Sequence, residues 1–283
     1  AIKQRTCDLA QPTISGMTGS NGKPHITWKA VEGAVSYKIY RANKKDGTYK
    51  LMYTSEGTGY SNTNAEIGYT YYYKIRAIAE NTDANSAYSN VVSAYAVSNK
   101  YQYTYASAKT VYYGSSARNT NLYLACKAIN GTILAPGDSF SFNEVVGPRT
   151  PSKGYQKAPI VGGSGYGGGV CQVATTLFNA TLEGNLKITK RRQHSVKPAY
   201  VPLGRDAAIY KTSKDFCFVN DSDYYIKIQA SANGGVVKMT LLTRESNVSP
   251  AKDVKLTVTQ SGNTYTLKRS YQGVVNYTTK STY

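Results

Sequence analysis

Charge is scarce in this sequence of 283 residues, and negative charge is the scarcest: Asp and Glu total 16, against 34 Lys and Arg. Charged residues make up 18% of the chain, below the ~25% usual for soluble domains. The polar surface therefore depends on Ser, Thr, Asn, Gly and Tyr. Long apolar runs are also missing, because none approaches the ~18 residues of a membrane-spanning helix. This absence argues against a membrane-spanning protein.

The large aromatic residues are unevenly used, with 1 Trp and 5 Phe but 27 Tyr. Abundant aromatic and β-branched residues argue against intrinsic disorder. Tyr, Thr, Val and Gly favour strands and turns, which argues against a helix bundle. We therefore expect a largely β protein of about two domains, given ~150 residues per domain.

The net charge of +18 indicates an anionic partner. Residues 1–100 carry +5 of it and residues 101–283 carry +13. Zinc-finger spacing, a basic zipper and an RNP signature are all missing, so nucleic acid is not an expected partner. An anionic cell surface remains the better candidate.

Only four cysteines occur, at positions 7, 126, 171 and 217, and none forms a CxxC pair. Structural zinc and a disulfide-stapled scaffold are therefore not expected. We predict no metal and no cofactor. The sequence begins at Ala1 without an initiator Met or an apolar signal segment, so we expect any secretion signal to lie outside it.

Residues 11–97 have the pattern of a β-sandwich with about seven strands. Alternating segments around Tyr37–Arg41 and Tyr71–Ala77 are separated by turn-forming clusters, and Trp28 lies on an early strand. The order of these features resembles a fibronectin type III domain. This resemblance implies a spacer or binding module, and the segment shows no catalytic constellation.

The second half predicts a mixed α+β domain. Residues 98–120 look like a linker and leading segment, and residues 119–129 have helical periodicity with Cys126 on the apolar stripe. We expect Cys126 to be a buried, inert thiol. A short strand is predicted over residues 139–142, a second helix from about Cys171 to Leu182, and strands again from Ile188 onward.

A cysteine directly follows a glycine run, Gly167-Gly168-Gly169-Val170-Cys171. Glycines allow positive φ and the close approach of a substrate. A thiol in the first turn of a helix meets free N–H groups and the positive end of the helix dipole, which favour the thiolate. The same N–H groups suit the stabilisation of an oxyanion. Phosphate binding by this loop is less favoured, because no Gly-Lys-Ser/Thr follows.

A catalytic thiol needs a base, and the chain has two histidines. His25 lies in the predicted sandwich, which leaves His194 as the candidate. Asp206 is our first choice to orient the imidazole, with Asp215 and Gln172 as alternatives. Two alternatives remain open at this point: a structural histidine that follows the predicted helix, and a glycine run that is only a flexible loop.

Further motifs surround these residues in the chain. They are Pro136–Asn143, Val146–Thr150, Gly154-Tyr155, Gly167–Val173, Thr175–Leu177, Asn179-Ala180, Arg191, His194-Ser195 and Gly204–Ala207. In this order they resemble the VanW-like family over residues 115–245, about half the chain.

The resemblance implies peptidoglycan chemistry, and members have been assigned as L,D-transpeptidases. It makes Cys171 the nucleophile and His194 the expected base. For binding of peptide stems we predict Gly168, Gly169, Gln172, Arg149, Tyr155, Arg191 and Arg205. Three alternatives stay open: a cysteine peptidase acting on the stems, a non-catalytic wall-binding adaptor and, most distantly, a nucleic-acid binder.

The sequence thus predicts a mainly β N-terminal sandwich followed by an α+β catalytic domain with a C-terminal β extension. The expected bounds are 1–10 for a leader or linker, 11–97 for the sandwich, 98–245 for the α+β domain and 246–283 for the extension. Expected partners are peptidoglycan stems and anionic wall polymers, with no transmembrane segment. The expected location is extracellular, at the cell wall.

Overall fold

The computed structural model describes residues 8–283 and divides the chain between Lys100 and Tyr101 into two compact units. Each unit is described by itself below. Most of the predicted leader, residues 1–10, lies outside the described residues, as does Cys7. The predicted domain bounds stay predictions.

The first unit is a β-sandwich, as predicted. One sheet has the order β1-β2-β5 and the other β4-β3-β6-β7, and all pairs are antiparallel. The elements are β1 (Ile14–Thr18), β2 (Pro24–Trp28), β3 (Ala34–Ala42), β4 (Lys50–Ser55), β5 (Gly59–Ser61), β6 (Thr70–Ala79), the 3-10 turn η1 (Thr82–Ala84) and β7 (Val92–Tyr95). Strand β6 alternates strictly, so its residues from Tyr71 to Ala79 point inward at every second position.

Tyrosine serves this core because its ring packs inside while its hydroxyl reaches polar groups at the rim. The hydroxyl of buried Tyr73 accepts a hydrogen bond from Asn62 Nδ2 at 2.8 Å. The hydroxyl of Tyr37 accepts one from the Val31 N–H at 2.7 Å. Part of the tyrosine excess therefore belongs to the packing of the sandwich.

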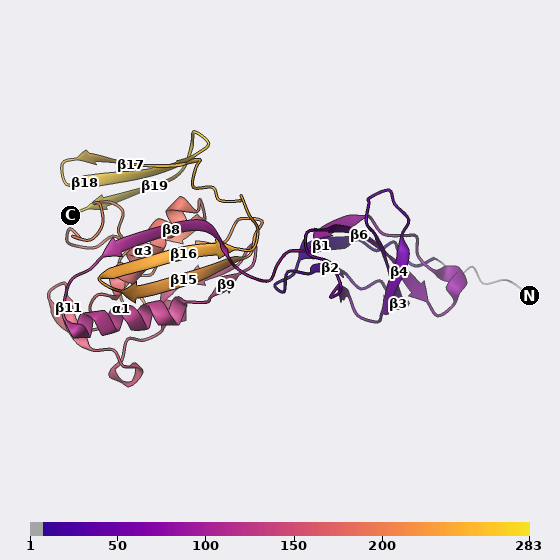
Figure 1. Ribbon diagram of the computed structural model, residues 1–283, viewed down its shortest axis with the longest axis horizontal. Coiled ribbons are helices and arrows are strands. Elements are labelled where there is room, and N and C mark those ends of the chain that lie inside the picture. Colours follow the sequence, from indigo (N-terminus) through magenta and orange to yellow (C-terminus); the bar gives the residue numbers. More distant parts are fainter. Residues whose placement is uncertain (1–7) are drawn as a thin grey trace, which may run out of the picture. The chain divides into compact units, whose positions relative to one another are not determined.

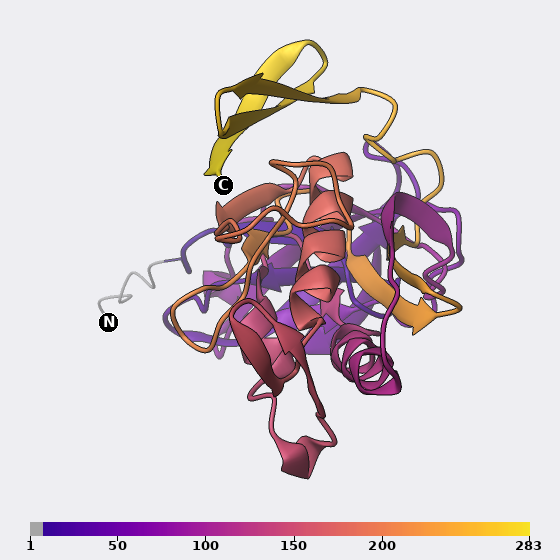
Figure 2. The same cartoon turned by 90° about the vertical axis from the view of Figure 1, so that its left-hand side faces the viewer.

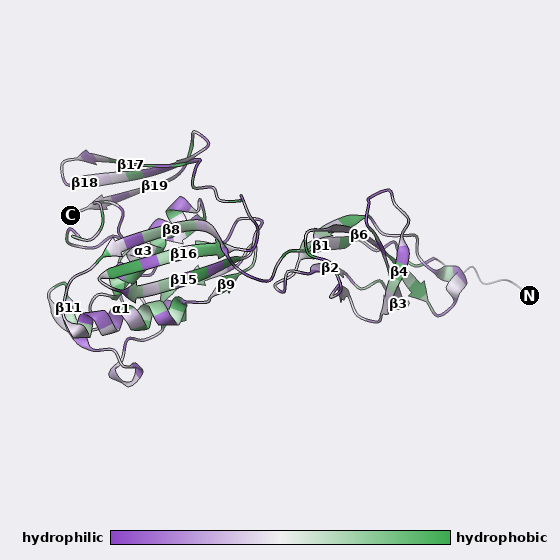
Figure 3. Cartoon of the chain, viewed as in Figure 1, coloured by the Kyte–Doolittle hydropathy of each residue, from purple (hydrophilic) through white to green (hydrophobic). Residues whose placement is uncertain are grey.

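The second unit is built on a four-stranded antiparallel sheet of order β8-β16-β15-β9, with helices α1 and α3 packed against one face (Figure 1). These elements are β8 (Tyr103–Val111), α1 (Ser116–Ile129), β9 (Ile133–Leu134), α3 (Val170–Glu183), β15 (Ile226–Asn233) and β16 (Val236–Thr243). Strand β16 is mostly hydrophobic (Figure 3), and its Val237, Met239 and Leu241 are fully buried. The helices and this sheet face enclose the core that holds α3 in place.

Further elements complete the second unit. They are β10 (Ser139–Ser141), α2 (Phe142–Val146), η2 (Pro151–Lys153), β11 (Lys157–Ile160), β12 (Gly163–Tyr166), β13 (Lys187–Lys190), β14 (Cys217–Val219), β17 (Val254–Ser261), β18 (Thr264–Tyr271) and β19 (Val274–Thr282). Strands β17–β19 form a separate antiparallel sheet, which Figure 2 shows beyond one end of α3. The predicted C-terminal strands are present.

Two local predictions need correction. The presumed linker over residues 98–120 contains strand β8 and the start of α1. The side chains of β8 that face α3 are small, Ala106, Ala108 and Thr110, so the strand had no strong apolar alternation. The strand predicted over residues 139–142 ends at Ser141, whose hydroxyl caps helix α2 by accepting from the Glu144 N–H at 3.2 Å.

Candidate active site

The glycine run forms a tight loop that leads into α3. Gly167 and Gly169 have φ of 79° and 105°, a region that L side chains rarely adopt. Gly168 has ordinary φ, but a Cβ there would lie 2.4 Å from the Ala158 carbonyl oxygen. The loop therefore packs on the β11–β12 hairpin, and all three glycines have a structural reason. A role of Gly168 and Gly169 in substrate binding stays a prediction.

Cys171 lies in the first turn of α3, as predicted, and its side chain is partly exposed. Its Sγ is 3.4 Å from the Ile209 carbonyl oxygen. Burial opposes the thiolate, but the hydrogen bond and positive charge of His194, the Ile209 contact and the charge of Arg149 together hold the pKa of Cys171 below its ordinary value. A lowered pKa favours the reactive form of a thiol.

His194 and Asp206 lie together, although twelve residues separate them. Asp206 Oδ2 is 2.7 Å from both His194 Nδ1 and the His194 backbone N. Burial favours neutral imidazole, but the bonds to Asp206 and to the Cys171 side chain outweigh it and raise the pKa of His194 to about 9. The three residues therefore form a chain of thiol, imidazole and carboxylate, with the imidazole in the middle.

Asp206 is completely buried, and two further residues, Arg191 and Tyr283, hold it as an anion. Arg191 donates to its Oδ1 through Nη2 at 2.7 Å and to its carbonyl through Nε at 2.6 Å. The Tyr283 hydroxyl also donates to Oδ1. Burial raises the pKa of Asp206, but the His194 bond, the Arg191 charge and the Tyr283 bond lower it to about 2.

Arg191 was predicted to bind substrate, and the structure places it inside this network. Its side chain is 4% exposed, and Nη2 also bonds the Ser281 hydroxyl at 2.7 Å. The C-terminal end of the chain thus contacts this network through Ser281 of β19, which bonds Arg191, and through Tyr283, which bonds Asp206. We could not foresee this from the sequence, because the partners lie about 90 residues apart.

A polar stripe along α3 fixes the segment that carries Asp206. Thr175 Oγ1 donates to the Ala207 carbonyl at 3.1 Å and accepts from the Ala207 N–H at 3.0 Å. Asn179 bonds Arg205 through both amide atoms: Oδ1 accepts from Nε at 2.7 Å and Nδ2 donates to the carbonyl at 2.8 Å. Thr175 and Asn179 are polar residues on a buried helix. Because buried polar groups need hydrogen-bond partners, their place within an apolar helical pattern could have marked them in the sequence.

Gln172 does not face the thiol. It is 1% exposed, and its Oε1 accepts from Arg118 Nη2 at 2.7 Å while its Nε2 donates to the Val111 carbonyl at 2.9 Å. It therefore ties α3 to the end of β8. Arg118, which the sequence analysis did not single out, packs beside Gly169.

The other predicted site residues differ in how they relate to Cys171 and His194. Arg149 donates to Asn143 Oδ1 and contributes charge at Cys171. Tyr155 is 4% exposed and belongs to the core. Asp215 accepts from the Ser141 hydroxyl at 2.7 Å and from the Asn143 N–H at 2.9 Å, so it orients α2 and has no contact with His194. Asp206 is thus the carboxylate beside the imidazole.

The other described thiols differ from Cys171. Cys126 is 1% exposed, and burial raises its pKa to about 12, which confirms the predicted buried thiol. Burial and the nearby Asp215 carboxylate raise the pKa of Cys217 to about 11. Only Cys171 among the three has a lowered pKa.

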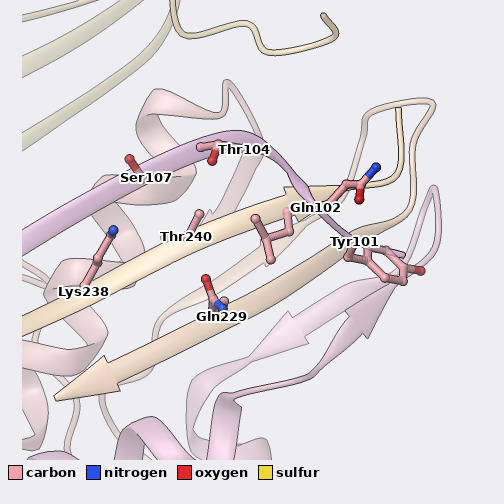
Figure 4. A pocket seen from close by; sticks show the side chains of 8 residues that line it. Tyr101, Gln102, Thr104, Ser107, Gln229, Lys238 and Thr240 are labelled. Atoms are coloured by element: carbon pink, nitrogen blue, oxygen red, sulfur yellow. The ribbon is translucent and has the colours of Figure 1, made fainter. Parts of the chain in front are cut away.

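Two hollows lie on the second unit. The larger, about 370 Å³, lies on the face of the β8–β16–β15 sheet away from the helices, where Ser107, Thr240, Gln229 and Lys238 point outward (Figure 4). The smaller, about 230 Å³, is lined by residues of β8 and α3 and by a loop that includes Tyr200. The Tyr200 hydroxyl is 3.4 Å from His194 Nε2, so the smaller hollow adjoins the candidate site.

Within residues 8–283, no group of three or more His, Cys, Asp or Glu side chains is arranged to hold a metal ion. None of the helices in the same range is long and apolar enough to cross a membrane.

Comparison with known proteins adds to this geometry. Residues 117–242 match the family model described as VanW like protein. The chain is 42% identical over 140 residues to the uncharacterized protein YoaR of Bacillus subtilis, covering 47% of this chain and 46% of YoaR. It is 34% identical over 112 residues to the vancomycin B-type resistance protein VanW of Enterococcus faecalis, covering 36% and 41%. The chain thus spans less than half the length of these relatives.

Solved structures similar to the chain include an Fn3-like protein from Clostridium thermocellum. It shares 28% identity, covers 31% of this chain and 92% of its own, and has a TM-score of 0.28. The strand order of the first unit carries the sandwich assignment without it.

Proposed function

From the premise that residues 117–242 of this chain are a VanW-like domain, we propose that the protein is a peptidoglycan L,D-transpeptidase with Cys171 as its nucleophile. One observation carries the proposal: Cys171 opens α3, and the imidazole that lowers its pKa, His194, is held by Asp206 through Nδ1 at 2.7 Å. Nucleophile, base and orienting group in this order are what thiol acyl transfer needs.

In the first half-reaction the Cys171 thiolate attacks the carbonyl carbon of the third residue, a diamino acid, in a donor peptide stem. The first-turn N–H groups of α3 stabilise the oxyanion of the tetrahedral intermediate. The amide C–N bond then breaks, and His194 gives its proton to the leaving amine of the terminal D-residue. A thioester on Cys171 and a neutral imidazole remain.

In the second half-reaction the side-chain amine of another stem attacks the thioester. His194 takes the proton of that amine, the C–S bond breaks, and the thiolate–imidazolium pair is restored. Asp206 keeps its charge throughout and stabilises the imidazolium, since its own pKa lies at about 2. The product is a cross-link between two stems.

The charge of the chain fits this setting. The net charge of +18, with +13 in residues 101–283, suits a wall that contains anionic polymers. We therefore place the protein outside the cell, at the wall, where the positive charge holds it close to its substrate. Arg149, beside Cys171, is the cation we assign to a stem carboxylate.

Incubation with purified muropeptides tests the proposal. Wild-type protein should form new dimers, and Cys171→Ala should form none. Cys126→Ala is the matched control, because that buried thiol has no part in the chemistry, and it should retain dimer formation. If the wild type forms shortened monomers but no dimers, the activity is that of a peptidase and not of a transferase. Unchanged muropeptides with the wild type would favour a wall-binding adaptor, and unchanged activity of Cys171→Ala would refute the nucleophile.

A further inference from the structure

Strand β8 is the edge strand of its sheet, and β16 is its one neighbour. The Tyr112 N–H donates to the Gly235 carbonyl at 2.7 Å, next to the strand pairing with β16. Backbone groups alternate direction along a strand, so those of residues 106, 108 and 110 also point toward β16. The backbone groups of residues 105, 107, 109 and 111 therefore point away from the sheet.

Two side-chain bonds agree with this alternation. Gln172 Nε2 donates to the Val111 carbonyl at 2.9 Å, and Ser249 Oγ donates to the Tyr105 carbonyl at 2.6 Å. Between them, no hydrogen bond from another described segment reaches the outward backbone of Ser107 or Lys109. The middle of this edge thus offers unpaired donors and acceptors.

The hollow of about 230 Å³ runs along this edge. Residues 107–110 form one wall, and Asn179 and Glu183 of α3 with residues 200–202 and Arg205 form the other. Glu183 and Arg205 both line the hollow and approach each other to 3.4 Å. The hollow therefore offers charges of both signs, which suits a peptide carrying carboxylates and an amine.

The hollow adjoins the candidate site through one residue, Tyr200. Cys171, Thr175, Asn179 and Glu183 are spaced by four residues and share one face of α3. Cys171 and Asn179 are about 12 Å apart along the helix at 1.5 Å per residue. An extended peptide covers this length with three to four residues, at about 3.4 Å each. Tyr200 lines the hollow and places its hydroxyl 3.4 Å from His194 Nε2.

We propose that the donor peptide stem binds in this hollow as an added strand along the outer edge of β8, with its reacting carbonyl toward Cys171. The backbone of Ser107 and Lys109 pairs with the stem, as in other peptide-binding sheets. Glu183 and Arg205 receive its charged groups. This inference rests on the proposed function for the identity of the peptide.

The test measures binding without turnover, in a Cys171→Ala background. The probe is a fluorescently labelled synthetic tetrapeptide stem whose third residue is a diamino acid, and anisotropy gives its Kd. Lys109→Pro removes one outward N–H and places a ring in the hollow, at an edge position where proline is tolerated. We expect about tenfold weaker binding, the effect of losing a hydrogen bond. Lys109→Ala keeps the N–H and should bind within about twofold of the background.

Hydrogen exchange in the background variant gives a second readout that does not depend on the fold of Lys109→Pro. Saturating probe should slow exchange at the amides of Ser107 and Lys109 and leave Lys238 unchanged. Equal affinity of the Pro and Ala variants, or unchanged exchange at Ser107 and Lys109, would overturn the inference. If both results are as expected but the wild type forms no muropeptide dimers, the proposed transpeptidase reaction is wrong and the peptide-binding site is still supported.

Discussion

Replacing Asp206 by Asn removes one negative charge from the chain of groups behind the thiol. The amide keeps nearly the same size, so the change is mainly electrostatic. In the wild type, Asp206 bonds His194 through Oδ2 at 2.7 Å and Arg191 through Oδ1 at 2.7 Å. The variant leaves Arg191 without its counter-charge and deprives the imidazolium of its stabilising partner.

The size of the effect follows from the pKa of His194, which rises from 6.5 to about 9. A rise of ~2.5 units corresponds to about 3 kcal/mol at 1.36 kcal/mol per unit. Asp206 and Cys171 share this stabilisation, so we assign about half of it to Asp206. Loss of that half lowers the equilibrium constant for forming the thiolate–imidazolium pair roughly tenfold, and so lowers its population by up to that factor near neutral pH.

The assay is the rate of Cys171 alkylation by iodoacetamide as a function of pH. In wild type the rate should fall only as pH drops through the lowered pKa of Cys171. In Asp206→Asn it should be roughly tenfold lower at pH ~6–7 and converge with wild type above pH ~9, where both thiols are ionised. Asp215→Asn is the control, because that buried carboxylate does not touch His194. Identical profiles for wild type and Asp206→Asn would refute the electrostatic account.

Three further predictions follow from the same contacts. Gly168→Ala should lower the free energy of unfolding by at least ~2 kcal/mol in chemical denaturation, because its Cβ meets the Ala158 carbonyl, whereas Gly57→Ala, with ordinary φ and space, should change it by less than ~1 kcal/mol. The contribution of His194 to the free energy of unfolding should be complete below pH ~6.5 and lost as pH rises through about 9, and that of Asp206 should be complete above pH ~4 and lost as pH falls through about 2. Urea unfolding of wild type and Asp206→Asn from pH ~2 to ~10 would show both losses in the wild type. A variant whose unfolding free energy runs parallel to that of wild type across this range would contradict the prediction. Cys126 should resist alkylation in the folded protein at pH 8 and react only after denaturation, as peptide mass spectrometry would show; rapid native labelling would contradict its burial.

The start of α3 and the position of its thiol could be predicted from the sequence, because three consecutive glycines before an apolar helical pattern are a strong local signal. The sandwich was predictable for a similar reason, since strict alternation around Tyr37 and Tyr73 requires only neighbouring residues. In contrast, β8 was missed because small residues face α3 and the strand depends on that helix and on β16 for its stability.

His194 was reachable by elimination, and Asp206 was the first choice among three candidates for its partner, but the surroundings of Asp206 were not predictable. Arg191 and Tyr283, which both bond the carboxylate, come from distant parts of the sequence. Tyr200 was missed because a tyrosine in a loop of a Tyr-rich chain carries no local signal. Contacts between distant segments determine these roles, and the local residue pattern of the sequence does not predict such contacts.

Intact-protein mass spectrometry after rapid mixing with a synthetic tetrapeptide stem tests the central claim most directly. The account predicts a transient mass increase equal to the tripeptide acyl group, located on Cys171 by peptide mapping, sensitive to hydroxylamine and missing in Cys171→Ala. Release of the terminal D-residue by wild type without any adduct on Cys171, or an adduct that persists in Cys171→Ala, would contradict it.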